Sequence, residues 1–181
     1  MSRIGLLQQP YPEAFAAVAA KVAAPGTEPL GLFTAMGQSQ KALDRFLAGA
    51  VPAKGALDFH TREIIIDRTA ARTGCEYEWG IHTQLFAAKA GISPEQVRST
   101  FDGNADDGYW DAKDAAVIAT VDALLANKRL NDAEFARISA HFDTDALLEM
   151  VQLVNFYHGV ALFTGAIDLP CEPGMGRFPK D

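Results

Sequence analysis

Apolar residues recur along most of this chain at intervals of three and four, the spacing that places side chains on one face of an α-helix. In one such stretch Leu32, Phe33 and Met36 are followed by Leu43. Together with proline and capping residues at helix ends, the pattern predicts helices at 12–24, 30–50 (broken near Gly37), 58–72, 74–91, a short helix from 94, then 111–127, 131–141 and 145–167. The sequence therefore predicts an all-α fold.

One segment also fits a strand. Ile64, Ile65 and Ile66 are consecutive β-branched residues, which are common in strands. The polar residues around them do not alternate with a period of two, so the pattern favours a helix at 58–72 that Asp58 caps.

Composition narrows the class of protein. The 181 residues are 49% apolar and 22% charged, which is ordinary for one globular domain. A formal charge of -7 argues against nucleic acid or an anionic membrane as a partner. Two distant cysteines indicate a reduced protein, and we find neither a signal peptide pattern nor a segment approaching the roughly 18 apolar residues that a membrane span requires. We expect a soluble, cytoplasmic protein.

The most informative stretch runs from Glu63 to His82. Cys75, Glu78 and His82 are spaced i, i+3 and i+7, so a helix would place all three on one face. Such groups are costly to bury without polar partners. Glu63, on the preceding helix, could reach the same place and orient His82. We interpret this face as a candidate site for proton transfer, because neighbouring carboxylates and imidazoles shift each other's pKa.

The predicted start of this helix determines the position of Cys75 within it. Thr73 and Glu76 match a capping box with Thr73 as the N-cap residue. Cys75 would then be the second helical residue, where backbone N–H groups and the helix dipole favour a thiolate. The alternative is a structural thiol, because free cysteine is among the most often buried residues.

Other interpretations of the same helix stay open. Glu78 and His82 could form a plain surface salt link, or could bind a metal together with a second carboxylate. We expect no metal, because no second histidine lies near them in the sequence. Tyr77 and Trp79 are expected to provide packing walls, with a pocket border as the alternative.

Three further candidates are weaker. The segment 102–107 resembles the start of a calcium loop, but Asp107 and Lys113 stand where glycine and glutamate are needed, so we predict a solvated loop. His158, in the apolar last helix, is expected to be a satisfied core histidine, with a pocket residue as the alternative. Cys171 lies in a proline- and glycine-rich tail without an evident partner.

These motifs resemble the carboxymuconolactone decarboxylase family, which includes the AhpD-like alkylhydroperoxidases. The resemblance is most specific from about residue 62 to 97. AhpD-like members carry a glutamate, then twelve residues later a Cys-x-x-Cys, then a histidine four residues after the second cysteine. Glu63, Cys75 and His82 match this pattern, as does the run Ala90-Gly-Ile-Ser that follows, whereas Glu78 replaces the second cysteine.

The resemblance implies an organisation for the chain. We expect an AhpD-like helical bundle as a single domain at 53–169, preceded by an N-terminal helical extension at 1–52 and followed by an irregular tail at 170–181. The resemblance also implies a homo-oligomer (a dimer, trimer or hexamer) with sites near subunit contacts.

The resemblance implies two kinds of chemistry. In the peroxidases, the second cysteine attacks peroxide and the first forms a disulfide with it, so this chain lacks that cycle unless Cys171 folds over the site. The decarboxylase branch acts on a small lactone without a cofactor, and we expect no cofactor here. Decarboxylation also needs a cation for the substrate carboxylate, for which Arg62, Arg68 and Arg72 are candidates.

Three functional hypotheses follow. The favoured one is a cofactor-free lyase or isomerase that acts on a small organic acid or lactone. Glu78 and His82 would be the acid–base pair, Glu63 the orienting carboxylate and Cys75 an auxiliary proton donor. The alternatives are a thiol peroxidase that uses Cys75 and a non-catalytic oligomeric binding protein.

Overall fold

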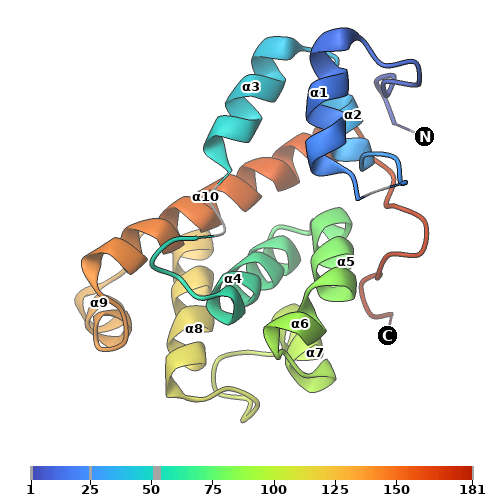
Figure 1. Ribbon diagram of the computed structural model, residues 1–181. Helices are drawn as coiled ribbons and strands as arrows, with labels where there is room; N and C mark the ends of the chain where they lie inside the picture. The colour runs from blue at the N-terminus through green and yellow to red at the C-terminus, as the bar shows by residue number, and fades with distance from the viewer. Residues whose placement is uncertain (1, 25, 51–53, 181) are drawn as a thin grey trace.

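The computed structural model describes residues 2–24, 26–50 and 54–180, and every regular element within these ranges is a helix (Figure 1). The helices are α1 (Glu13–Val22), α2 (Gly31–Met36), α3 (Gln40–Gly49), α4 (Phe59–Arg72), α5 (Glu76–Leu85), α6 (Ala87–Ala90), α7 (Pro94–Asp102), α8 (Ala112–Asn127), α9 (Asp132–Ser139) and α10 (Thr144–Ala166). The predicted all-α fold is confirmed.

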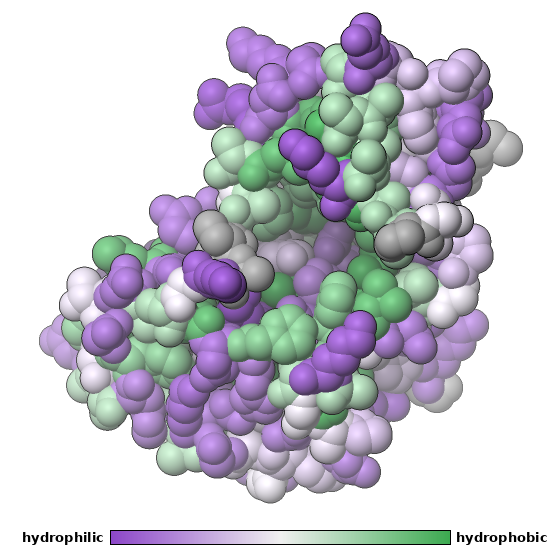
Figure 2. Space-filling view, in the orientation of Figure 1, coloured by the Kyte–Doolittle hydropathy of each residue, from purple (hydrophilic) through white to green (hydrophobic). Residues whose placement is uncertain are grey.

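The helices form two regions on either side of α10 (Figure 1). In the larger region α4 packs against α5, α7, α8 and α10, whereas α1, α2 and α3 lie together beyond α10. The surface is hollowed between the two regions (Figure 2). The predicted domain boundary at 52–53 falls on residues that lie outside the described ranges, so the domain division stays a prediction.

Two helix breaks have local causes. The predicted break near Gly37 separates α2 from α3, because Ser39 adopts an extended backbone and its side chain caps α3 by accepting a hydrogen bond from the N–H of Ala42. The helix predicted at 74–91 is divided at Phe86, so α5 and α6 are separate, and α6 ends at Gly91 with a left-handed φ of 75°.

Helix α4 forms as predicted and is covered on all sides. The Asp58 carboxylate caps it by accepting a hydrogen bond from the backbone N–H of Thr61 at 2.7 Å. Ile64, Ile65 and Ile66 are helical and almost completely buried. Three successive apolar side chains suit a helix with neighbours on every face, which explains why the segment has no simple amphipathic pattern.

A buried arginine joins α4 to α7 and α8. The guanidinium of Arg68 donates to both carboxylate oxygens of Asp122, at 2.7 and 2.6 Å, and to the carbonyls of Ser99 and Thr100. Arg72, one turn further along α4, is partly exposed and binds the same carboxylate at 3.0 Å. Both arginines are therefore engaged with Asp122.

Helix α10 is long and apolar enough to cross a membrane, so the expectation that no segment has this character is wrong. Length and composition alone are weak evidence, because core helices of soluble proteins pass the same test. Leu148, Val151 and Leu162 of this helix are exposed by 63%, 46% and 67%. Such a stripe is typical of a surface that contacts another chain, and the homo-oligomer stays a prediction.

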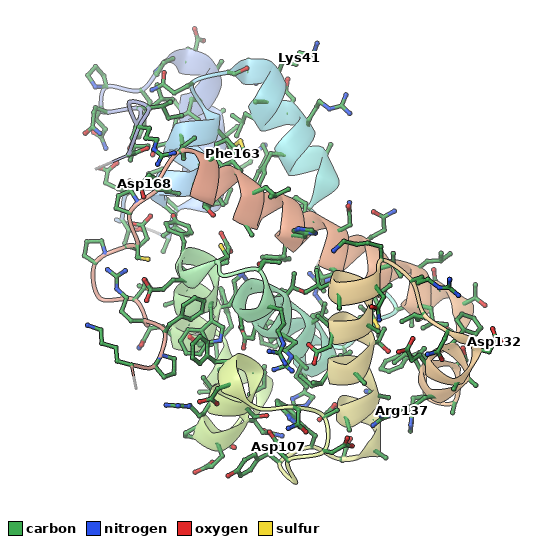
Figure 3. All side chains as sticks on the ribbon, turned by 180° about the vertical axis from the view of Figure 1, so that it is seen from behind. Lys41, Asp107, Asp132, Arg137, Phe163 and Asp168 are labelled. Atoms are coloured by element: carbon green, nitrogen blue, oxygen red, sulfur yellow. The ribbon has the colours of Figure 1, made fainter. Side chains whose placement is uncertain are left out.

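The C-terminal tail runs beside α5 (Figure 3). The backbone N–H of Gly176 donates to the carbonyl of Gly80 at 3.1 Å. The ring of Phe178 packs at 5.5 Å from Trp79 and at 4.7 Å from Phe101. The tail therefore covers one face of α5 with defined contacts.

We expect Gly80→Ala to lower the free energy of unfolding by about 1–3 kcal/mol, because overpacking a close contact has this cost. A Cβ at residue 80 would lie 2.1 Å from the carbonyl oxygen of Gly176, so the tail would be displaced. Urea unfolding measures the effect. Gly159→Ala is the matched control, since no described atom lies within 4 Å of its added Cβ and alanine favours the helix. Equal effects of the two substitutions would contradict the expected role of the contact.

Candidate active site

The N-terminus of α5 differs from the prediction. The hydroxyl of Thr73 donates back to the carbonyl of Thr69 at 2.7 Å, and Gly74 adopts a left-handed φ of 69°. Cys75 is the capping residue and α5 begins at Glu76. Thr73 as N-cap and Cys75 as the second helical residue are therefore wrong predictions, because the threonine hydroxyl is used at the end of α4.

The Cys75 thiol lies in an apolar setting. It is 5% exposed, and its Sγ lies 3.4 Å from the hydroxyl oxygen of Thr164 on α10. Burial raises the pKa of Cys75, although the backbone N–H groups of Tyr77 and Glu78 act in the opposite direction. The expectation that the helix start favours a thiolate is therefore wrong, because desolvation outweighs the backbone groups.

His82 is held at both ring nitrogens. Its Nδ1 lies 2.8 Å from Oε2 of Glu63 on α4, as the sequence predicted. Its Nε2 lies 3.1 Å from the hydroxyl of Tyr157 on α10 and 3.5 Å from Oε2 of Glu78, one turn earlier on α5. The side chains of Glu63, Glu78 and His82 are all buried. The structure thus brings three of the four predicted residues into direct contact, and Cys75 lies beside Glu78.

Two members of this polar cluster were missed by the sequence analysis. Asp67 follows Glu63 by one helical turn, and both its carboxyl oxygens are buried without a hydrogen-bond partner among the described residues. Its spacing of i+4 from Glu63 was a usable signal. Tyr157 comes from α10, and no local spacing links it to His82.

Burial and neighbouring charges shift the pKa values of the cluster residues in different directions. Burial alone would lower the pKa of His82, but the hydrogen bond to Glu63 and the charges of Glu63, Glu78 and Asp67 raise it overall. Burial raises the pKa of Glu78, while His82 opposes this. Burial, assisted by the Glu63 charge, raises the pKa of Asp67 well above its ordinary value. The cluster therefore retains protons that exposed groups would lose.

The same residues bear on metal binding. One ligand atom from each of Glu63, Asp67 and His82 lies within 4.8 Å of the others, so the three side chains could hold a metal ion. Carboxylate and imidazole groups suit several divalent ions. The absence of a metal stays a prediction.

We expect Asp67→Asn to reduce the pH dependence of stability. Because the pKa of Asp67 is raised in the folded protein above its ordinary value of 3.8, the folded state holds a proton that the unfolded chain releases. The free energy of unfolding then falls as the pH rises from about 4, by up to about 1.4 kcal/mol per pH unit. Denaturant unfolding between about pH 5 and 7 should show a shallower decline in the variant. Identical declines would contradict the prediction.

The other residues singled out in the sequence are Arg62, His158 and Asp107. Arg62 is buried on α4, and its charge opposes the burial that raises the pKa of Tyr157. His158 is only partly buried and lines a surface pocket, so the predicted core histidine is wrong. Asp107 accepts hydrogen bonds from Ser99 and from nearby backbone, which occupies its carboxylate within the predicted loop.

The second cysteine, Cys171, lies in the C-terminal tail. The Sγ of Cys171 lies 3.6 Å from Oε2 of Glu76 at the start of α5.

Tyr77 donates to Glu172 at 2.6 Å, and Trp79 donates to Thr100 at 3.0 Å. Both aromatic residues are buried, so they provide packing walls as predicted.

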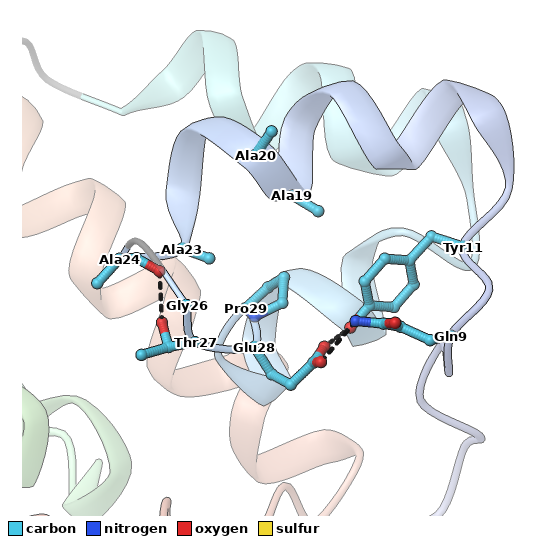
Figure 4. A pocket seen from close by; sticks show the side chains of 10 residues that line it. All are labelled: Gln9, Tyr11, Ala19, Ala20, Ala23, Ala24, Gly26, Thr27, Glu28 and Pro29. Carbon is cyan, nitrogen blue, oxygen red and sulfur yellow. Dashed lines mark hydrogen bonds between the residues drawn. The ribbon is translucent and has the colours of Figure 1, made fainter.

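A separate pocket of about 410 Å³ lies between α1 and the segment before α2 (Figure 4). Its Glu28 carboxylate accepts hydrogen bonds from Gln9 and Tyr11. These residues satisfy one another, and the titratable cluster around His82 is not part of the lining. We therefore place the candidate chemistry at His82.

The arrangement of the helices is an AhpD-like fold, as the resemblance implied. Residues 37–122 match the model of the carboxymuconolactone decarboxylase family, the family that the motifs resemble. The chain is similar to the uncharacterized protein YnjA of Escherichia coli (strain K12), with 27% identity over 127 residues that cover 70% of this chain and 69% of YnjA.

Solved structures agree on the fold. An uncharacterized peroxidase-related protein from Ralstonia eutropha JMP134, described as an alkylhydroperoxidase AhpD core, superposes with a TM-score of 0.83 at 19% identity and covers 99% of this chain and 98% of its own. The debrominase Bmp8 superposes with a TM-score of 0.74 at 16% identity, covering 93% and 91%. At these identities the likeness shows the fold alone.

Proposed function

We propose that the protein is a cofactor-free lyase or isomerase that moves protons on a small oxygenated molecule such as an organic acid or lactone. One observation carries the proposal: His82 is fixed by Glu63 at one ring nitrogen and faces Glu78 and Tyr157 at the other. The match of residues 37–122 to the carboxymuconolactone decarboxylase family supports an enzyme of this kind without specifying the reaction.

Each group has a role in the proposed chemistry. Glu63 accepts the Nδ1–H of His82, which fixes the ring and stabilises its protonated form. The Nε2–H can then be donated to a substrate oxygen, while the Glu78 carboxylate accepts a proton from carbon. Tyr157 supplies a hydroxyl beside Nε2 that can hold the same substrate oxygen. Cys75 keeps its thiol proton and borders Glu78.

The structure gives less support to the two alternatives. A thiol peroxidase needs a reactive thiolate, and Cys75 is buried with a raised pKa. A purely structural cluster should satisfy its polar groups, whereas the buried carboxyl of Asp67 has no hydrogen-bond partner among the described residues. Such an unsatisfied group is typical of a functional site.

The reactivity of Cys75 tests the peroxidase alternative. In a Cys171→Ser background we expect the pH profile of Cys75 alkylation to have a midpoint above the ordinary 9.0, because burial disfavours the thiolate. Peroxide treatment should leave no sulfenic acid that dimedone can trap. A midpoint below the ordinary value with trapped sulfenic acid would favour the peroxidase.

Proton exchange in D₂O tests the proposed function without a known product. Small lactones and unsaturated acids would be incubated with the protein, and loss of carbon-bound protons would be followed by NMR. We expect exchange with at least one compound and none with a Glu78→Gln, His82→Ala double variant. Exchange that persists in the double variant would overturn the proposal.

A further inference from the structure

The surface pocket that His158 lines has a volume of about 190 Å³ and lies where the ends of α4 and α8 meet α10. Helix α4 packs against both other helices, so the three walls belong to one packed unit (Figure 1). The polar lining consists of Arg72 and Thr73 from the end of α4, Lys128 from the end of α8 and His158 from α10. None of them belongs to the polar cluster around His82, so this pocket is a separate feature.

The pocket is cationic although the chain as a whole carries a formal charge of -7. Of the described residues that line it, none is an aspartate or a glutamate. Asp122 lines the neighbouring hollow, and its carboxylate is shared by Arg68 and Arg72. Burial acts to raise the pKa of Asp122, but the hydrogen bonds from both arginines lower it overall, so the carboxylate is ionised at neutral pH. With Lys128, these four side chains carry two net positive charges.

The basic groups of the lining keep hydrogen-bond donors for a ligand. Arg72 binds Asp122 through Nε and Nη2, which leaves Nη1 without a hydrogen-bond partner among the described residues. Lys128 donates to one backbone carbonyl, and its ammonium has three N–H groups. In the ranges that the structure describes, the imidazole of His158 has no hydrogen-bond partner, and it can donate one N–H even when neutral.

The backbone of Lys128 also points to a use for its side chain. This residue ends α8 in the left-handed conformation, with a φ of 59°. Glycine is the commonest residue at such a helix end, because a Cβ is disfavoured there. Lysine lacks this advantage but brings an ammonium group to the pocket.

The remainder of the lining is apolar. Leu125 of α8 lines the pocket together with Ala161 and Leu162 of α10, and Leu162 is 67% exposed. These side chains would be covered by hydrocarbon, which an inorganic anion does not possess. The volume is below the roughly 300–1,000 Å³ of sites for drug-sized molecules, so the ligand must be small. The lining therefore suits an anion with a small apolar body.

We propose that this pocket binds a small organic monocarboxylate with an apolar body, such as an aromatic acid. Its carboxylate would accept hydrogen bonds from Arg72, Lys128 and His158, because charge-assisted bonds are strong and a guanidinium matches the planar carboxylate. The hydroxyl of the adjacent Tyr157 lies 3.1 Å from Nε2 of His82, so the ligand would contact the helix that supports the candidate active site. Binding of such an acid does not depend on the proton transfer proposed for His82.

Two probes of the same shape and different charge test this binding. Solutions of 4-fluorobenzoate and 4-fluorobenzamide would be titrated separately by ¹⁹F NMR at neutral pH, where the acid is ionised. We expect the acid to bind at least about fivefold more tightly, because only the acid forms charge-assisted hydrogen bonds. The ring protons of His158, identified by their loss in His158→Ala, should shift with the same midpoint concentration of acid.

Lys128→Gly and Arg129→Ala form a matched pair of variants. Each removes one positive charge from adjacent exposed residues, but only Lys128 lines the pocket. We expect Lys128→Gly to weaken binding of the acid about two- to fivefold, the range for one exposed ion pair. Arg129→Ala should leave it unchanged. Glycine suits the left-handed backbone of residue 128, so the variant should fold, and thermal unfolding checks this.

Equal affinities for the acid and the amide, no saturable binding of the acid, or equal losses in Lys128→Gly and Arg129→Ala would each overturn the proposed site. Binding of the acid that leaves the His158 resonances unmoved would place the acid elsewhere and would overturn it as well. Inorganic phosphate that binds as tightly as 4-fluorobenzoate would overturn the assignment of a ligand with an apolar body.

Discussion

Replacing Glu78 with glutamine is expected to lower turnover by about 10²–10⁴-fold, the usual loss when a positioned proton-transfer group is removed. Glutamine retains the size of the side chain and its hydrogen-bonding capacity, but it cannot accept a proton. Glu78 lies 3.5 Å from Nε2 of His82 and is 5% exposed, so water has little access to replace it. Steady-state rates on the compound identified by proton exchange measure the effect.

Two comparisons make this prediction specific. His82→Ala should cause a loss of similar size, because the same proton transfer needs both groups. Glu13→Gln changes an exposed glutamate on α1 and should leave the rate unchanged. A Glu78→Gln enzyme that keeps the native rate would remove Glu78 from the chemistry.

Replacing Arg68 with leucine is expected to lower the free energy of unfolding by about 3–5 kcal/mol. The Arg68 side chain is fully buried and donates to Asp122 and to the carbonyls of Ser99, Thr100 and Gly103. The substitution leaves a partly buried carboxylate and these carbonyls without their donor, which is more costly than losing the attraction itself. Urea unfolding monitored by circular dichroism measures the loss.

Arg72→Leu is the control for this substitution, because it removes a second arginine from the same carboxylate. The Arg72 side chain is 39% exposed, so we expect a loss of about 0–1 kcal/mol. Comparable losses in the two variants would show that burial of Arg68 does not determine its contribution.

Local signals predicted much of the fold. Asp58 marked the start of α4, and Gly37 marked the break between α2 and α3. These features depend on a few neighbouring residues, which is why sequence reasoning found them. The start of α5 was predicted wrongly because the Thr73 hydroxyl had a competing acceptor, the carbonyl of Thr69, and Gly74 turns the chain.

The candidate site was predictable only where its residues share a helix or adjacent helices. Glu78 and His82 lie one turn apart on α5, and Glu63 lies on the preceding helix, from which it was expected to reach His82. Tyr157 is 75 residues from His82, and only the tertiary packing of α10 against α4 brings its hydroxyl to Nε2. The raised pKa of Cys75 depends on burial, so position at a helix start could not predict it.

Titration of the His82 imidazole by NMR tests the central claim most directly and needs no substrate. The account predicts a midpoint above the ordinary 6.5, because Glu63 and the neighbouring carboxylates outweigh the effect of burial. In Glu63→Gln the midpoint should fall, since the hydrogen-bonded carboxylate at Nδ1 is lost. A midpoint at or below 6.5 that does not move in Glu63→Gln would contradict the account of His82 as a carboxylate-supported acid–base group.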